Sequence, residues 1–152
     1  MPNLQFLISN FSFLMAYFSN QIRVTYGDTD QMGIVYHANY LNYFEISRTE
    51  MMRAQGLTYR ELESAGIFLQ VVHCELDFHH PARYDDLLEI RSSISSLGKA
   101  SIAIVSEVWL DGKPLVTGTV KLAALSRTSG CIVPLPLELI SAIRKFCLSP
   151  SA

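Results

Sequence analysis

The hydrophobic pattern is strongest in the second quarter of the chain, where apolar side chains recur with the period of an α-helix. From Ala38 onward these positions, with one small serine among them, fall on one side of a helix: Tyr40, Tyr43, Phe44, Ser47, Met51 and Ala54. Glu45 is spaced to pair with Arg48 along one flank. Gly56 is suited to end the helix. The pattern predicts one uninterrupted helix of about four to five turns.

Most of the remaining chain alternates between polar and apolar positions, as half-buried β-strands do. This alternation predicts strands at residues 21–26, 69–78, 87–97, 100–110 and 115–126. Asp111-Gly112 predicts a tight hairpin between the last two strands. Shorter helices are predicted at 58–64, which opens with a capping box, and after Pro136. The order predicts an α+β domain in which a curved antiparallel sheet of about five strands wraps the only long helix.

Length and composition fit one globular domain. The chain has 152 residues, of which 49% are hydrophobic and 17% charged. Its formal net charge of −2 lacks the basic excess that binding to nucleic acid requires. The three cysteines are far apart and form no C-x-x-C pair. Their spacing argues against a disulfide framework and a thiolate zinc site, and it indicates a reducing cytoplasm.

The first twenty residues differ from the rest because they carry no charge. Polar residues interrupt this run, which has neither a basic start nor a small-residue cleavage site, so stable membrane insertion is not expected. We predict an apolar N-terminal extension at residues 1–20, a single domain at 21–147 and a C-terminal tail at 148–152. The extension is expected to pack on the body of the protein or in a subunit contact, or to be an upstream segment of little functional weight.

A polar loop at residues 27–33 leads into the long helix. The exposed N–H groups of a helix's first turn stabilise developing negative charge, and a carboxylate opposite them can attack a carbonyl or activate water. Asp28 and Asp30 both lie in this loop. Because aspartate also favours turns and caps, spacing alone leaves the role of Asp30 open, and Asp28 is expected to support the loop by accepting backbone N–H groups.

The residues around this loop carry a resemblance to a known family. Residues 28–37 form the run D-x-D-x-x-G-x-V-Y-H, and the likeness continues along the helix to Glu50. It resumes at the Pro-Ala-Arg turn of residues 81–83, ahead of a strand. Over about residues 21–136 the chain resembles the hot-dog fold 4-hydroxybenzoyl-CoA thioesterase family, in particular its YbgC-type branch of acyl-CoA thioesterases. The N-terminal extension departs from that family, which usually begins close to its first strand.

The resemblance implies hydrolysis of an acyl-CoA thioester to free acid and CoA, in a homodimer or homotetramer with the active site between subunits. Carried over by position, Asp30 is the catalytic carboxylate, His37 and Tyr26 are further catalytic candidates, and the backbone at His37 and Ala38 is the oxyanion site. Glu45 is the alternative catalytic acid, because other hot-dog thioesterases place theirs on the central helix. A thioester is activated, so a carboxylate and an oxyanion site suffice without a metal or other cofactor.

Several assignments stay open at the level of sequence. Arg83, Lys99 and Arg127 are candidates for binding the CoA phosphates, although each is also an ordinary surface charge. Short-chain, medium-chain, 4-hydroxybenzoyl and 1,4-dihydroxy-2-naphthoyl groups are all compatible with the resemblance, and acyl carrier protein can replace CoA. The alternative functions are an acyl-ACP thioesterase, a hot-dog dehydratase and a non-catalytic acyl-thioester binding protein. The dehydratase is disfavoured because no histidine lies inside the long helix.

Overall fold

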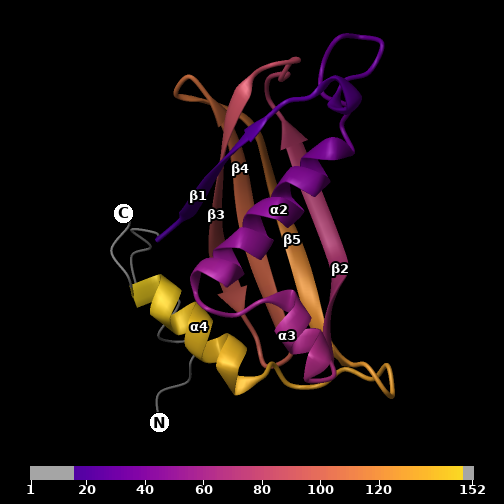
Figure 1. Ribbon diagram of the computed structural model, residues 1–152, viewed down its shortest axis with the longest axis vertical. Helices are drawn as coiled ribbons and strands as arrows, with labels where there is room; N and C mark the ends of the chain where they lie inside the picture. Colours follow the sequence, from indigo (N-terminus) through magenta and orange to yellow (C-terminus); the bar gives the residue numbers. More distant parts are fainter. Residues whose placement is uncertain (1–15, 149–152) are drawn as a thin grey trace.

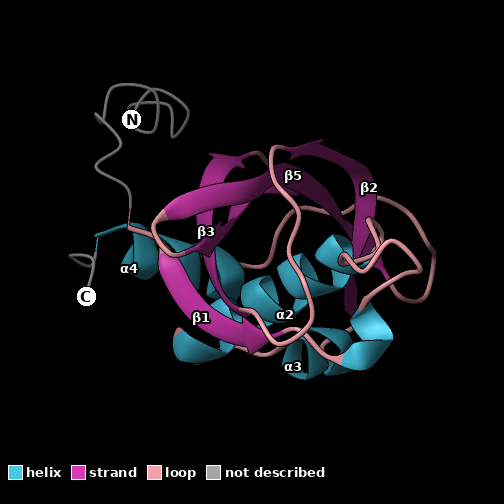
Figure 2. Ribbon diagram, turned by 90° about the horizontal axis from the view of Figure 1, so that it is seen from above, coloured by secondary structure: helices cyan, strands magenta, loops and turns pink. Residues whose placement is uncertain are grey.

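The computed structural model describes residues 16–148, which form one five-stranded antiparallel sheet with helices packed on it (Figure 1). The strands are β1 (Phe18–Arg23), β2 (Ile67–Phe78), β3 (Leu87–Leu97), β4 (Ser101–Leu110) and β5 (Lys113–Ser126). Their order is β1-β3-β4-β5-β2, so β1 and β2 are the two edges. Seen from above, the sheet curves around helix α2 (Asn39–Ala54), as Figure 2 shows. The predicted α+β arrangement is confirmed.

Four of the strands lie where the alternation predicts them, but β1 lies three residues earlier than the predicted strand at 21–26. It pairs with β3 from Phe18 to Arg23, and residues 26–28 form a 3-10 turn instead. The strand stops because Asp28 accepts hydrogen bonds from the backbone and hydroxyl of Thr25, which closes a capping box. The sheet therefore includes the end of the predicted extension, whose residues 1–15 lie outside the described part of the chain.

Helix α2 packs its apolar side against the concave face of the sheet. The buried residues of the helix are Tyr40, Tyr43, Phe44, Ser47, Met51 and Met52. The prediction that Ala54 belongs to this face is wrong, because Ala54 is exposed and Met52 is buried in its place. The reason is the C-terminal helix α4 (Leu137–Leu148), which covers the side of the last turn where Met52 lies. A helix that packs on two partners buries a wider stripe than the sheet alone requires.

Close contact between α2 and the sheet depends on one glycine and three serines. A Cβ added at Gly118 of β5 would lie 2.7 Å from Cε2 of Phe44, so only glycine lets the helix approach this closely. The Ser47 Oγ lies 2.8 Å from the Ser92 Oγ, which lies 2.7 Å from the Ser106 Oγ. All three serines are buried, so this chain of hydroxyl groups joins α2, β3 and β4 inside the core.

Two short helices complete the described fold. Helix α3 (Tyr59–Ser64) opens with the predicted capping box, in which Thr58 Oγ1 accepts from Glu61 N and Glu61 Oε2 accepts from Thr58 N at 2.7 Å. Helix α4 buries Leu139, Ile143 and Phe146 against the end of α2. Between residues 16 and 148, no helix has the length and apolar character needed to cross a membrane.

Candidate active site

The polar loop ahead of α2 folds as a small hairpin that leads directly into the helix. An isolated antiparallel bridge joins Thr29 and Val35. The Asp30 N–H donates to the Ile34 carbonyl at 3.0 Å. Gly33 at the tip has φ of +73°, in the left-handed region that suits glycine. These backbone contacts hold Asp30 at a fixed place relative to the start of α2.

Asp30 is half-buried, and one of its carboxylate oxygens is committed to the loop. Its Oδ1 accepts a hydrogen bond from the Met32 N–H at 2.8 Å. Within the described chain no hydrogen bond reaches Oδ2, and neither His37 nor Tyr26 contacts the carboxylate by a hydrogen bond. A carboxylate that is held by one oxygen and free at the other is suited to act as a nucleophile or a general base.

Asp28 forms hydrogen bonds with residues that precede the loop and with residues that follow it. Its Oδ2 accepts from the Thr25 N–H at 2.7 Å and the Thr25 hydroxyl at 2.8 Å. Its carbonyl accepts from the Tyr36 N–H and the Asn39 side-chain amide, each at 2.8 Å. Burial, followed by the charge of Asp28, raises the pKa of the Tyr43 phenol, so Tyr43 stays a neutral hydroxyl beside this carboxylate. These contacts agree with the supporting role predicted for Asp28.

Helix α2 begins without a side-chain cap. Ala38 occupies the N-cap position and cannot accept a hydrogen bond through its side chain. Within residues 16–148, the N–H groups of His37 and Ala38 donate to no backbone acceptor, and both residues are exposed. The His37 ring packs at 4.4 Å from the Tyr36 ring. An uncapped start leaves orphan donors and the positive end of the helix dipole open to a ligand, which is the property an oxyanion site needs.

Tyr26, just ahead of the loop, belongs to an exposed aromatic pair. Its ring stacks on Tyr84, with centroids 4.0 Å apart and planes 10° apart, and its side chain is 77% exposed. The neighbouring Tyr26 hydroxyl raises the pKa of Tyr84. Sequence reasoning missed Tyr84, because no periodic signal links two residues that the fold brings together from distant segments. In the described part of the chain, no hydrogen bond joins Tyr26 to Asp30.

The three candidate cations for CoA lie at opposite ends of the sheet. Arg83 is next to the loop, where its Nη1 donates to the Gly33 carbonyl at 3.4 Å. Lys99 lies in the β3–β4 turn and Arg127 follows β5, both at the end away from the loop (Figure 1). The Arg127 N–H donates to the Gly66 carbonyl at the start of β2. Of these three candidates, Arg83 is the one that contacts the loop carrying Asp30.

A groove of about 190 Å³ runs along the flank of α2 that faces β2 and β5. Its walls are Leu41, Asn42, Glu45, Arg48, Val71, Cys74 and Val120. The predicted ion pair between Glu45 and Arg48 is wrong, because no ion pair joins them in the described chain. Arg48 lies instead against the half-buried Tyr59 of α3. Glu45, the alternative catalytic acid, is thus exposed in the groove without a cationic partner.

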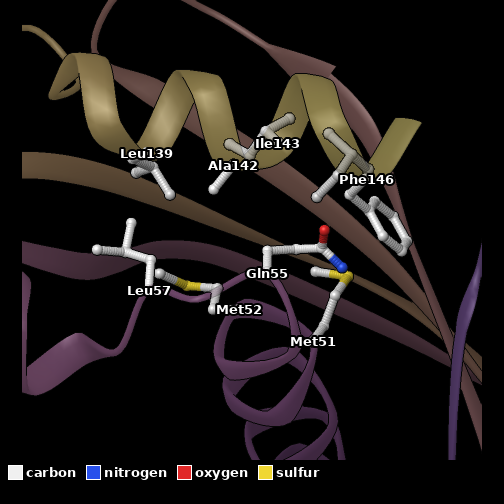
Figure 3. A pocket seen from close by; sticks show the side chains of 9 residues that line it. Met51, Met52, Gln55, Leu57, Leu139, Ala142, Ile143 and Phe146 are labelled. Carbon is white, nitrogen blue, oxygen red and sulfur yellow. The ribbon is translucent and has the colours of Figure 1, made fainter. Parts of the chain in front are cut away.

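Two further features bear on what the described part of the chain can bind. No group of three or more His, Cys, Asp or Glu residues there could hold a metal ion. A second cavity lies between α4 and the end of α2, where Gln55 reaches between Met51 and Phe146 (Figure 3). Its volume is about 20 Å³, which is room for a single water molecule. This cavity is a packing gap and not a substrate site.

Comparisons with known proteins define the class. Residues 24–143 match the family described as the thioesterase-like superfamily, and the chain belongs to this family. The acyl-CoA thioesterase YbgC of Haemophilus influenzae is 34% identical over 82% of this chain and 93% of that protein. The acyl-CoA thioester hydrolase YbgC of Escherichia coli O6:H1 is 36% identical over 57% of this chain, and the chain spans only 65% of that relative's length.

The solved structures confirm the fold expected from the resemblance. Slr0204, a 1,4-dihydroxy-2-naphthoyl-CoA thioesterase from Synechocystis, superposes with a TM-score of 0.80 over 84% of this chain and 96% of that chain. Its sequence identity is 22%, so this likeness shows the hot-dog fold alone.

Proposed function

We propose that this protein is an acyl-CoA thioesterase, which hydrolyses a short-chain, medium-chain or aromatic acyl-CoA to free acid and CoA. The observation that supports this most is the half-free Asp30 carboxylate, held on a hairpin that continues into the uncapped start of α2. The thioesterase names of relatives at 34% and 36% identity support the same class. An assay of thiol release identifies the acyl group, and it shows whether the thiol carrier is CoA or acyl carrier protein.

In the proposed reaction the thioester carbonyl lies at the start of α2. The N–H groups of His37 and Ala38 donate to its oxygen as negative charge develops there. Asp30 either attacks the carbonyl carbon, which expels the CoA thiolate and leaves a mixed anhydride, or removes a proton from the attacking water. In the first route water then hydrolyses the anhydride and regenerates the carboxylate. The imidazole of His37 is the proposed donor of a proton to the leaving thiolate.

A second copy of the chain completes the site in this proposal. β2 is an edge strand, whose outer backbone groups are open to pairing. Large hydrophobic side chains are exposed along it: Phe68, Val71, Val72 and Phe78. Antiparallel pairing of β2 with its copy would bury them and would bring the loop of one subunit next to the opposite end of the other. Lys99 and Arg127 would then approach the Asp30 of the other subunit. Arg83 would lie near the Asp30 of its own subunit.

The deciding experiment follows the release of free thiol from a panel of short, medium and aromatic acyl-CoAs and from acyl carrier protein thioesters. Wild-type protein should release thiol, and Asp30→Asn should reduce kcat by about 10²- to 10⁴-fold. Asp111→Asn, in the β4–β5 turn, is a matched control because Asn accepts the positive φ of Asp111. Full activity in Asp30→Asn with loss in Glu45→Ala would transfer the catalytic role to Glu45. No thiol release by the wild type would favour a non-catalytic binding protein.

Two measurements refine the mechanism and the assembly. In a single turnover in heavy-oxygen water, label in the Asp30 carboxylate would support an anhydride that water opens at the Asp30 carbonyl, whereas direct attack of water on the thioester places the label in the product acid alone. A strictly monomeric protein in solution would contradict a site shared between subunits. We also propose a cytoplasmic location, which the three unpaired cysteines support.

A further inference from the structure

Asn39, the first residue of α2, links the helix to the loop that carries Asp30. The residue is half-buried, and its side-chain amide donates to the Asp28 carbonyl at 2.8 Å. A carbonyl oxygen only accepts hydrogen bonds, so the Nδ2 of the amide faces it. The hydrogen bond joins residues eleven positions apart in the chain and closes the base of the loop.

The same carbonyl also binds the residue on the other side of the proposed oxyanion site. The Tyr36 N–H donates to the Asp28 carbonyl at 2.8 Å, and the Asn39 N–H donates to the Tyr36 carbonyl at 2.9 Å. The segment from Tyr36 to Asn39 is therefore a tight turn, both ends of which are fixed to Asp28. His37 and Ala38 are the central residues of this turn, so the position of their N–H groups depends on these contacts.

Asp30 lies on the opposite arm of the loop, two residues after Asp28. Its N–H donates to the Ile34 carbonyl at 3.0 Å, and an isolated bridge beside it completes a hairpin made of backbone contacts. This hairpin does not need the Asn39 amide. The amide instead connects the hairpin to the first turn of α2. It therefore acts on the distance between the carboxylate and the N–H groups, which catalysis requires to be fixed closely.

We propose that Asn39 is a positioning residue, which sets the distance between the Asp30 carboxylate and the N–H groups of the proposed oxyanion site. This inference rests on the proposed thioesterase function. Without the amide, the Tyr36 N–H alone holds the start of α2 to the Asp28 carbonyl, and the helix can shift relative to the hairpin. A misplacement of about 1 Å can lower a rate by about 10²-fold. Substrate binding should change little, because Asn39 does not line the groove beside α2.

The test measures thiol release by Asn39→Leu, which removes the amide donor and keeps a side chain of similar size. The substrate is the acyl thioester of the panel on which the wild type is most active. We expect kcat to fall by about 10- to 100-fold and KM to change by less than about 3-fold, as when an interaction acts only on transition-state geometry. Arg53→Leu is the matched control and should keep the wild-type kcat. It makes the same replacement at the exposed end of the same helix, where Arg53 pairs with Glu50.

A double-mutant cycle with Asp30→Asn separates positioning from a structural role. The slow rates of these variants are measured in single turnovers with enzyme in excess. Once the carboxylate is absent, Asn39→Leu should lower the residual rate by less than about 3-fold, because no carboxylate remains to be positioned. A further loss as large as in the wild-type background would overturn the inference, because Asn39 would then act independently of Asp30. A change in KM alone would overturn it as well.

The remaining outcomes separate this inference from the function on which it rests. An unchanged kcat in folded Asn39→Leu would overturn the inference and leave the thioesterase intact. Absence of hydrolysis by the wild type for every acyl thioester would refute both. If Asn39→Leu does not fold, Asn39→Ala decides by the same criteria, because alanine favours a helix more than asparagine does. Failure of both variants to fold would show a structural role and overturn the inference.

Discussion

The chain of buried hydroxyl groups under α2 gives the sharpest expectation for stability. Ser92 lies in its middle, 2.8 Å from the Ser47 oxygen and 2.7 Å from the Ser106 oxygen. Ser92→Ala removes both hydrogen bonds and leaves two buried hydroxyl groups without this partner. At about 0.5–1.5 kcal/mol for each hydrogen bond, we expect a loss of about 1–3 kcal/mol in the free energy of unfolding. Ser106→Ala, which removes one hydrogen bond, should cost about half as much.

The loss should not be additive, because the cost arises from partners left unpaired. Replacing Ser47, Ser92 and Ser106 together by alanine leaves no orphan hydroxyl, so the triple variant should lose less than the sum of the three single variants. Ser64→Ala, at an exposed position of α3, is the control and should change stability by less than about 0.5 kcal/mol.

Denaturant titration at one fixed protein concentration measures these differences. Fixed concentration matters because subunit association raises apparent stability. Each kcal/mol should also lower the melting temperature by roughly 2–4 °C. The reasoning fails if Ser92→Ala is as stable as Ser64→Ala, or if the triple variant loses the full sum.

Three further expectations concern single side chains. Gly118→Ala places a Cβ 2.7 Å from Cε2 of Phe44. This overpacking should lower the free energy of unfolding, measured by denaturant titration, by about 1–3 kcal/mol. An unchanged midpoint would show that α2 can move to accommodate the methyl group. Hydrogen bonds from Arg91 lower the pKa of Glu89, so their stabilisation is present above the unfolded pKa of about 4.3 and is lost as pH falls through the folded value. The stability gap between wild type and Glu89→Gln should therefore close in acid, and a gap independent of pH would refute this account. Thr58→Ala removes the N-cap of α3 and should lower the free energy of unfolding by about 1 kcal/mol, measured by thermal melting. An unchanged melting temperature would show that packing alone holds α3.

Local pattern predicted the helices and strands well where one face is buried and the other is not. The face of α2 from Tyr40 to Met51 and both ends of β3 follow directly from the periodicity. The periodicity gave wrong predictions where a residue of α2 contacts another helix as well as the sheet. Helix α4 buries Met52, and Arg48 packs against Tyr59 instead of pairing with Glu45. Neither partner is close in sequence to the residue it affects, so helix spacing contains no signal for it.

The sequence by itself determined the α+β class, the long helix, the hairpin turns and the run around Asp30, because these depend on side-chain periodicity and on residues with special backbone preferences. Tertiary structure alone decided which Asp30 oxygen is free and which end of the sheet each candidate cation occupies. It also brought Tyr84 to Tyr26 and enclosed the groove between α2 and β2. These features arise from contacts between segments far apart in the chain, whose positions are fixed only when the sheet curves and α2 packs into it.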